Sequence, residues 1–242
     1  MAILESLLRS GNRKKIFKAL SLRKAITSKE LSNKTNLSWQ ETSKQLKLLE
    51  KMGLSTRVGT SYSLSQMGNL LKIKLEDFYK IEEKIIFLRD FIEKHDLSEI
   101  PGDLIREFGV WDAELLKMHP TEFYPLLEDV VKSTKRKLFL SNSLFLRLEV
   151  KKKVEVRAIY ALEAMKGDNL VYRQKLDGFS IRAIPRRKLY FFSLISDEER
   201  AWIGFRDFKR EFDFSQILYG GGEFCGWVLQ NFEYLWERSK EI

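Results

Sequence analysis

The stretch LSWQETSKQLKLLEKMG at residues 37–53 carries cationic, amide and aromatic side chains on one side of a predicted helix. At about 100° per residue, one arc of this helix holds Thr42, Leu46, Leu49 and Met52. The opposite arc holds no carboxylate and consists of Trp39, Gln40, Ser43, Lys44 and Lys47. Amide and ammonium groups donate hydrogen bonds to base edges and to phosphates. The pattern therefore favours a surface that binds nucleic acid, and a merely solvated helix face is the alternative.

The ends of this helix are marked in the sequence. Ser38 is a suitable N-cap, and Glu41 three positions later completes a capping box, in which each side chain accepts a hydrogen bond from the other residue's backbone N–H. Gly53 follows the last periodic residue, where a left-handed conformation closes a helix. A second capping box, Thr27 with Glu30, opens a shorter helix before it, and NKTNL supplies the turn between the two. Two capped helices joined by a short polar turn predict a helix-turn-helix.

The segments on either side of these helices complete the pattern of a winged helix. NRKKIFKAL at 12–20 predicts a helix with the apolar side Ile16, Phe17 and Leu20. LSTRVGTSYSL at 54–64 predicts a hairpin with a two-residue turn at Gly59-Thr60. Strand alternation leads us to expect that Arg57 points away from the core, towards DNA. The hairpin residues expected to face inward are Leu54, Thr56, Val58, Tyr62 and Leu64.

These motifs resemble two known families. Residues 1 to about 75 look like the winged helix-turn-helix domain of prokaryotic regulators of the ArsR/MarR kind, because SKQLKLLEKMGL has the cadence of their recognition helix and SYSLSQMGNLL that of their wing strand. FIEKHDLSEIPGDLIREFGVW resembles the start of the effector domain in archaeal FilR-type (methanogenesis-regulator) transcriptional regulators. The first resemblance implies DNA binding. The second implies an archaeal protein with a sensory C-terminal domain, and it assigns no ligand residue.

The charge is distributed unevenly along the chain. The whole sequence has a formal net charge of +9, but residues 1–80 alone contain 16 Lys or Arg and 6 Asp or Glu. The remaining 162 residues are close to neutral, with 27 basic and 28 acidic side chains. A basic excess confined to one domain indicates a polyanionic partner for that domain. The single cysteine fits a reducing cytoplasm, and we expect neither a signal peptide nor a membrane span.

A long helix is predicted from residue 65 to about residue 94, which is about 45 Å at the standard rise. Its apolar residues follow an a/d spacing that Lys74 interrupts, and they are Leu71, Phe78, Ile81, Ile85, Leu88 and Ile92. Such a seam can pair two subunits, and docking onto the chain's own C-terminal domain is the alternative. Pairing would suit DNA recognition, because a single winged helix makes few contacts and dimers bind two half-sites.

The rest of the chain has the pattern of a mixed α/β domain. Predicted strands cover 137–141, 152–160, 179–184, 188–196 and 201–205, and predicted helices cover 119–134, 161–176 and 224–239. The fold class expected is therefore α+β, with a winged-helix domain at 1–68, a linker and dimerisation helix at 69–95 and an effector-type domain at 96–242.

Residues suited to catalysis or metal binding are few. The two histidines, His95 and His119, are far apart in sequence, and Cys225 is predicted to be a small buried hydrophobe. Gly220-Gly221-Gly222 before a helix suits a phosphate, but Glu223 would repel it, so a flexible joint is favoured. Ser141, Asn142 and Ser143 follow an apolar strand and are the candidate ligand residues, since ligands gather at the carboxyl ends of strands; a helix cap is the alternative.

The sequence thus predicts a cytoplasmic, homodimeric regulator of transcription that binds double-stranded DNA. It needs no cofactor or metal, and a small molecule or a protein would act as effector on the C-terminal domain. We expect no enzymatic activity. Two alternatives stay open: a hydrolase-type enzyme that carries a nucleic-acid-binding module, and a winged helix used for protein interaction. The carboxylate-free helix face argues against the second.

Overall fold

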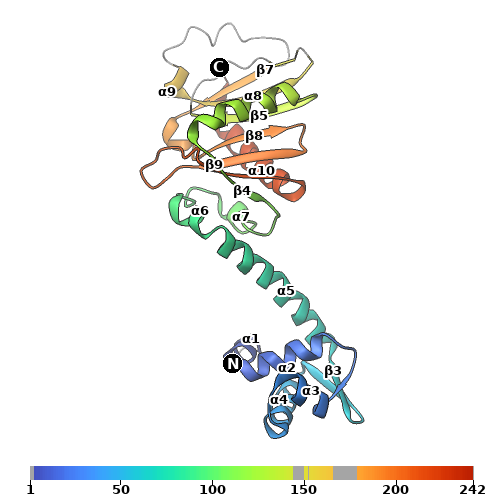
Figure 1. Ribbon diagram of the computed structural model, residues 1–242. Helices are drawn as coiled ribbons and strands as arrows, with labels where there is room; N and C mark the ends of the chain where they lie inside the picture. Colours follow the sequence, from blue (N-terminus) through green and yellow to red (C-terminus); the bar gives the residue numbers. More distant parts are fainter. Residues whose placement is uncertain (1–2, 144–149, 152, 166–178, 242) are drawn as a thin grey trace. The chain divides into compact units, whose positions relative to one another are not determined.

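The chain divides into two units, Met1–Glu82 and Glu83–Ile242 (Figure 1). The computed structural model describes residues 3–143, 150–151, 153–165 and 179–241. Each unit is organised around apolar core residues of its own. The division falls inside one helix, so the segment 69–95 predicted as a separate linker is shared between the two units.

The first unit begins with four helices, α1 (Ile3–Arg9), α2 (Gly11–Ser21), α3 (Ser28–Thr35) and α4 (Trp39–Lys51). Of these, α3 and α4 start directly after their predicted caps, Thr27 and Ser38. Thr27 and Glu30 form the predicted capping box of α3. Asn36 adopts a left-handed conformation (φ 52°) that ends α3, so only a short turn separates α3 from α4. Gly53, with φ 72°, follows α4 as predicted.

The core of the first unit joins these helices to one another. Its fully buried side chains include Ile16, Leu20, Leu31, Leu46 and Leu49. Thr42 is also buried, so the inward arc predicted for the helix at 38–52 is confirmed. Burial of a Leu or Ile side chain contributes about 1.5–3 kcal/mol, and this core therefore fixes which face of α4 remains at the surface.

A three-stranded sheet completes the winged helix. Its strands are β1 (Ile26–Thr27), β2 (Ser55–Val58) and β3 (Ser61–Leu64), in the order β1-β3-β2. Val58 pairs with Ser61, so Gly59 and Thr60 form the predicted two-residue turn, and Gly59 has the positive φ (61°) that its first position requires.

The expectation that Thr56 and Val58 face the core is wrong. Both are exposed, and Val58 has 76% of its surface accessible. Arg57 pairs directly with Tyr62, so these two side chains share the inward face of the hairpin. Thr56 and Val58 pair with serines of β3 and therefore lie on the outer face.

The predicted long helix is interrupted at Leu88. Helix α5 (Gln66–Phe87) has 22 residues, and α6 (Arg89–Lys94) follows it directly. The backbone N–H of Leu88 still donates to the carbonyl oxygen of Lys84, while the Leu88 side chain is fully buried in the second unit. The interruption thus occurs where the helix becomes part of the C-terminal core.

An eight-stranded sheet forms the centre of the second unit (Figure 1), with the strand order β11-β7-β6-β5-β8-β9-β10-β4. The strands are β4 (Glu114–Lys117), β5 (Lys137–Asn142), β6 (Glu155–Ala161), β7 (Phe179–Ile184), β8 (Phe191–Ser196), β9 (Arg200–Phe205), β10 (Gln216–Gly221) and β11 (Lys240–Glu241). Strands β5, β6 and β7 are parallel, and the other pairings are antiparallel. The five predicted strands correspond to β5–β9, and the α+β fold class is confirmed.

Helices cover both faces of this sheet. Helix α8 (Phe123–Ser133) packs on the face that carries Leu138 and Leu140, and α10 (Gly222–Arg238) packs on the face that carries Phe139, as strand alternation requires. The remaining helical elements are α7 (Gly102–Ile105), η1 (Pro120–Glu122), α9 (Leu162–Met165) and η3 (Arg186–Lys188). The predicted helix at 161–176 begins as α9, and most of its remainder lies outside the described residues.

Close packing of α5 against the wing gives a testable prediction. A Cβ added at Gly68 would overlap the carbonyl oxygen of Leu54, a backbone atom that cannot move aside cheaply. Gly68→Ala should therefore lower the free energy of unfolding of the first unit by about 1–3 kcal/mol, measured by urea unfolding.

Gly11→Ala is the matched control, because a Cβ at this helical position meets no atom within 4 Å. It should leave stability unchanged or raise it by up to about 1 kcal/mol. Equal stability of the two variants would contradict the packing described at Gly68.

Candidate nucleic-acid interface

The polar face of α4 lies at the surface of the first unit. Trp39 has 61% of its surface accessible, and Gln40, Lys44 and Lys47 are exposed, while Ser43 is half-buried. Neither Lys44 nor Lys47 forms an ion pair with any residue that the structure describes. The five predicted residues thus lie together on one surface. The ammonium groups of Lys44 and Lys47 are not neutralised by an ion pair with any carboxylate that the structure describes.

Glu41 is turned away from this face. Ser38 accepts a hydrogen bond from the backbone N–H of Glu41 (3.2 Å), which is the first half of the predicted capping box. The second half is not formed, because the carboxylate of Glu41 accepts hydrogen bonds from the side-chain amides of Gln45 (2.8 Å) and Asn12 (3.3 Å). The prediction of a complete capping box at Ser38 is therefore wrong, and the side chain of Glu41 binds to α2 instead.

Gln45 and Arg13 extend this network across the unit. The Nε of Arg13 donates to the amide oxygen of buried Gln45 (3.0 Å), and Nη1 of Arg13 donates to the hydroxyl and the carbonyl oxygen of Ser6 on α1. We call Ser6, Asn12, Arg13, Glu41 and Gln45 the α1–α2–α4 network. It fixes α4 to the two preceding helices through polar contacts that supplement the apolar core.

The network also affects the ionisation of its carboxylate. Hydrogen bonds from Gln45 and then from Asn12 hold the pKa of Glu41 below its ordinary value. A lowered pKa means that the folded protein favours the ionised form of Glu41. Its contribution to the stability of the folded protein is therefore fully present above the ordinary pKa of a glutamate, and it is lost as the pH falls through the lowered pKa of the folded state.

The wing presents two different surfaces beside α4. The Nε of Arg57 donates to the carbonyl oxygen of Gly59 (2.9 Å), and its guanidinium lies 5.7 Å from the centre of the Tyr62 ring. Arg57 is exposed, but it lies on the inward face of the hairpin and its side chain folds back over Tyr62, so the expectation that it points away from the core is wrong. The apolar side chain of Val58 projects from the outer face. The tip of the wing therefore offers one cation and one apolar group.

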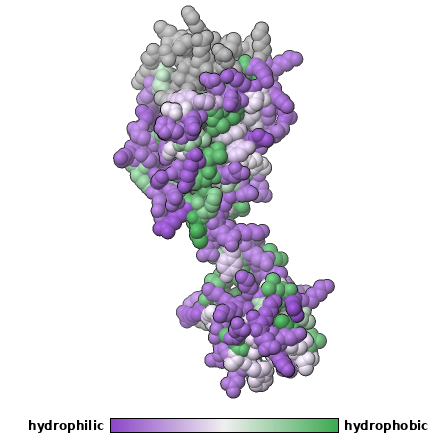
Figure 2. Space-filling model, viewed as in Figure 1, coloured by the Kyte–Doolittle hydropathy of each residue, from purple (hydrophilic) through white to green (hydrophobic). Residues whose placement is uncertain are grey.

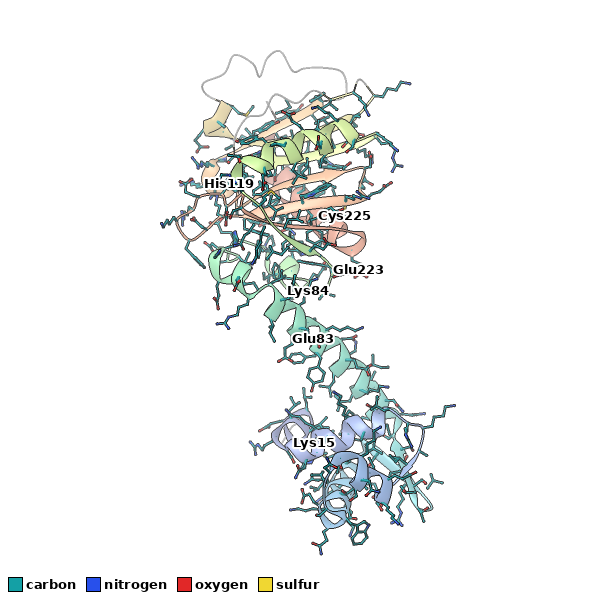
Figure 3. All side chains as sticks on the ribbon, viewed as in Figure 1. Lys15, Glu83, Lys84, His119, Glu223 and Cys225 are labelled. Carbon is teal, nitrogen blue, oxygen red and sulfur yellow. The ribbon has the colours of Figure 1, made fainter. Side chains whose placement is uncertain are left out.

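The histidines and the cysteine lie in separate surroundings in the second unit (Figure 3). His95 is buried: its Nδ1 lies 2.7 Å from the carbonyl oxygen of Phe91 and its Nε2 lies 3.4 Å from a carboxylate oxygen of Asp213. Burial lowers the pKa of His95, which favours its neutral form. His119 is exposed and caps η1. Among the residues described, no group of three or more His, Cys, Asp or Glu is arranged to hold a metal ion.

Cys225 is buried in α10, and its burial raises the pKa of the thiol to about 11. The thiolate is the reactive form of cysteine, so a raised pKa describes an inert side chain. This agrees with the interpretation of Cys225 as a small buried hydrophobe.

The three glycines before α10 do not form the flexible joint that was expected. Gly220 and Gly221 are the last residues of β10, and Gly222 (φ 53°) is the first of α10. A Cβ at Gly220 would lie 3.0 Å from the Asp112 carbonyl oxygen, and one at Gly221 would lie 2.9 Å from that of Glu199. Close packing thus requires Gly220 and Gly221, and the left-handed φ of Gly222 favours glycine there. The neighbouring pocket is rich in carboxylates, namely Asp112, Glu114 and Glu199, which disfavours a phosphate.

The candidate ligand residues of the second unit are buried. Ser141 and Asn142 end β5, which is parallel to β6, so they do lie at the carboxyl end of a strand, and Ser143 follows directly. The Ser141 hydroxyl lies 3.0 Å from that of Ser193 on β8. A helix capped by these residues would begin at 144–149, which lie outside the described residues. That these three residues bind a ligand stays a prediction.

Gln45 and Gln40 provide a pair of matched variants on one helix. Gln45→Ala removes a buried amide and leaves Arg13 and Glu41 without their shared partner, so the free energy of unfolding should fall by about 1–3 kcal/mol. Gln40→Ala truncates an exposed amide and should change stability by less than about 0.5 kcal/mol. Urea unfolding followed by circular dichroism measures both. Similar losses in the two variants would show that the network does not stabilise α4.

Comparison with known proteins gives only distant similarities. No family model matches the chain, and no curated protein matches it. Among solved structures 37 chains match. The chain is similar to TrmBL2, an archaeal chromatin protein described as showing a novel mode of DNA binding, with a TM-score of 0.42 and 17% identity over 98% of both chains.

Two further similarities cover parts of the chain. NucT from Helicobacter pylori has a TM-score of 0.42 and 12% identity, over 54% of this chain and 99% of that one. Ligand-free NadR has a TM-score of 0.28 and 20% identity, over 36% of this chain and 75% of that one. With TM-scores below 0.5, these similarities do not assign a function, which has to rest on the residues of the chain itself.

Proposed function

We propose that the protein is a homodimeric regulator of transcription that binds double-stranded DNA through α4 and the wing. The observation that carries this proposal is the exposed face of α4, which contains amide, hydroxyl, indole and ammonium groups, while the carboxylate of Glu41 in the first turn is held by hydrogen bonds from Asn12 and Gln45. A helix of this kind enters the major groove in winged-helix proteins. The net charge of +10 in residues 1–80 supports the same partner.

The residues of the face divide by chemistry. Gln40, Ser43 and Lys44, near the N-terminal half of α4, are the donors and acceptors for base edges, since recognition helices read bases with their N-terminal residues. Lys47, one turn further on, is the phosphate contact. Trp39 at the first helical position packs against the sugar–phosphate backbone. The wing adds Arg57 as a second phosphate contact.

The dimer is proposed to form through the exposed middle of α5. The apolar residues Leu71 and Leu75 of α5 pack on the first core, and Leu88 and Ile92, which follow α5, pack on the second. Helix α5 also exposes apolar side chains at helical spacing, among them Leu70 (60% accessible), Phe78 (56%) and Ile85 (44%). Figure 2 shows hydrophobic side chains among the hydrophilic ones at the surface of the first unit. A second copy of α5 would cover this stripe, and it would bring two α4 helices to two half-sites.

In this proposal the second unit is the sensory part and not an enzyme. Its effector would be a small molecule or a protein, with the carboxyl end of β5 as the candidate site, in keeping with the resemblance to FilR-type regulators. None of the helices described is long and apolar enough to cross a membrane. Incubating supercoiled plasmid with the protein and Mg²⁺ tests the enzymatic alternative, since nicking or linearisation would favour a nuclease.

Two substitutions on α4 test the assignment of roles. Gln40→Ala should cost about 1–3 kcal/mol of binding free energy at one base pair and relax the choice there, because a base-edge contact carries sequence information. Lys47→Ala should weaken binding to all sequences alike and reduce the slope of log K against log salt by about one unit. Fluorescence anisotropy with selected genomic fragments, titrated with salt, measures both effects.

Lys132→Ala, which removes an exposed lysine of α8 in the second unit, is the control and should change neither quantity. Unchanged affinity and specificity in both α4 variants would overturn the proposal that α4 reads DNA.

The dimer predicts a different pair of outcomes. Phe78→Asp combined with Leu70→Asp would bury charge in the stripe, so the dimer should dissociate to a folded monomer in sedimentation. Operator affinity should fall by about 100-fold or more, because the contacts to the second half-site are lost. Lys80→Asp, at an exposed polar position of α5, should remain dimeric. If the double variant sediments like the unchanged protein, α5 does not form the dimer interface and packs only within its own chain.

A further inference from the structure

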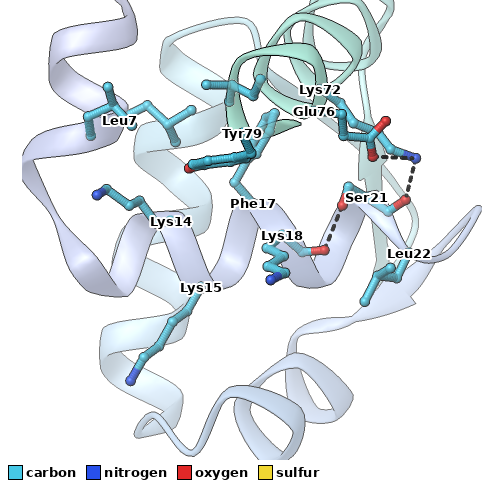
Figure 4. Close-up of a pocket in the computed structure, with 12 residues that line it drawn as sticks. Leu7, Lys14, Lys15, Phe17, Lys18, Ser21, Leu22, Lys72, Glu76 and Tyr79 are labelled. Carbon is cyan, nitrogen blue, oxygen red and sulfur yellow. Dashed lines mark hydrogen bonds and ion pairs between the residues drawn. The ribbon is translucent and has the colours of Figure 1, made fainter. Parts of the chain in front are cut away.

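The first unit contains a cavity of about 330 Å³ between α1, α2 and α5 (Figure 4). All its lining residues fall within Met1–Glu82, so it belongs to one unit. The apolar part of the lining consists of Leu7, Leu8, Phe17, Leu22, Leu75 and Tyr79. A cavity of this size is at the small end of the range for small-molecule sites, and apolar lining is their usual composition.

The rim of this cavity is basic. Lys14, Lys15 and Lys18 line it from α2, and Lys72 lines it from α5. Figure 4 shows Lys18 on α2. Lys72 comes from α5, and its ammonium donates a hydrogen bond to the carbonyl oxygen of Ser21, at the end of α2 (3.0 Å). The single carboxylate of the lining is that of Glu76, which lies 3.8 Å from the Lys72 ammonium.

The lysines of α2 have no carboxylate of their own. Within the part of the chain that the structure describes, Lys14, Lys15 and Lys18 form no ion pair. Lys14 and Lys18 are four residues apart on a helix, so their side chains are neighbours on one face and repel each other. Figure 4 shows the ammonium of Lys15 pointing away from the cavity. The three other lysines, with the one carboxylate of Glu76, leave the mouth of an apolar cavity with a net positive charge, which an anionic group would neutralise.

We propose that this cavity binds an amphipathic carboxylate, with its acyl or aryl part against the apolar lining and its carboxylate among Lys14, Lys18 and Lys72. The apolar lining selects against a small hydrophilic anion, since such an ion gains nothing from burial there. The basic rim selects against a neutral or cationic molecule of the same size. A ligand of this site therefore needs both an apolar part and a negatively charged group.

The site is separate from the DNA-binding face in the proposal above, although both involve α2. Asn12 and Arg13, which hold Glu41 and Gln45 of α4, directly precede the lysines of the cavity rim along α2. Binding of the carboxylate is measured without DNA, so its failure and a failure of DNA recognition are distinguishable.

Fluorescence of 1-anilinonaphthalene-8-sulfonate with the full-length protein provides the test. This probe is itself an apolar anion, and decanoate, kept below its micellar concentration, should displace it with saturation at one site per chain. Decanol and decyltrimethylammonium have the same chain length without the negative charge. Each should displace the probe at least about 10-fold less well than decanoate, because the net charge of the rim is positive.

Two variants locate the site. Lys14→Gln with Lys18→Gln removes two exposed ammonium groups and should weaken decanoate binding by about 10-fold. The matched control, Lys29→Gln with Lys34→Gln, changes the net charge equally on α3 and should bind as the unchanged protein does. Leu75→Trp fills the cavity and should abolish displacement, with circular dichroism confirming that the variant is folded.

Three results would overturn the proposal. One is equal displacement by decanoate, decanol and the ammonium compound, which would indicate a non-selective apolar surface. Another is equal decanoate affinity in the cavity-rim and control lysine variants. The third is loss of decanoate binding in the monomeric Leu70→Asp, Phe78→Asp variant, because a cavity completed only by a second copy of the chain would be part of the subunit interface.

Discussion

The charge and orientation of the polar face of α4 depend on where one carboxylate, that of Glu41, is held. A glutamate in the first turn of α4 stabilises the helix, since the N-terminus of a helix attracts negative charge, but on the exposed face it would repel phosphate. The hydrogen bonds from Gln45 and Asn12 resolve this conflict by holding Glu41 against α2. Arg13 then fixes Gln45. The same contacts that orient the carboxylate also orient α4, so the position and the charge of the face have a common origin.

Features that depend on residues close together in sequence could be predicted. The capping box of Thr27 and Glu30, the left-handed Gly53 and the two-residue turn at Gly59-Thr60 each involve residues within four positions of one another, and all three are present. The outward arc of α4 follows from helical periodicity alone, which is why its five polar residues were identified before their surroundings were known. What they bind is a separate question, which exposure does not answer.

Features that depend on distant residues could not be predicted. Arg13 and Gln45 are 32 positions apart, and no local pattern indicates that one is the partner of the other. Strand β4 pairs with β10, about a hundred residues later, and its short sequence ELLK has no distinct alternation of its own. The inward direction of Thr56 was a different kind of error. That expectation takes the inward side of the hairpin from Leu54. However, Leu54 precedes β2, and the turn at Gly59-Thr60 fixes which residues of β2 and β3 face each other.

Helix α5 shows why an apolar stripe indicates burial without identifying the partner. Its apolar residues serve three surroundings: Leu71 and Leu75 complete the first core, Leu88 lies in the second, and Phe78 lies at the surface between them. Periodicity is the same throughout, because the helix repeat is set by the backbone and not by what packs against it. A large apolar side chain at the surface of a basic unit is unfavourable unless a partner covers it. The proposed contact with a second molecule therefore rests on the residues that the two cores leave exposed.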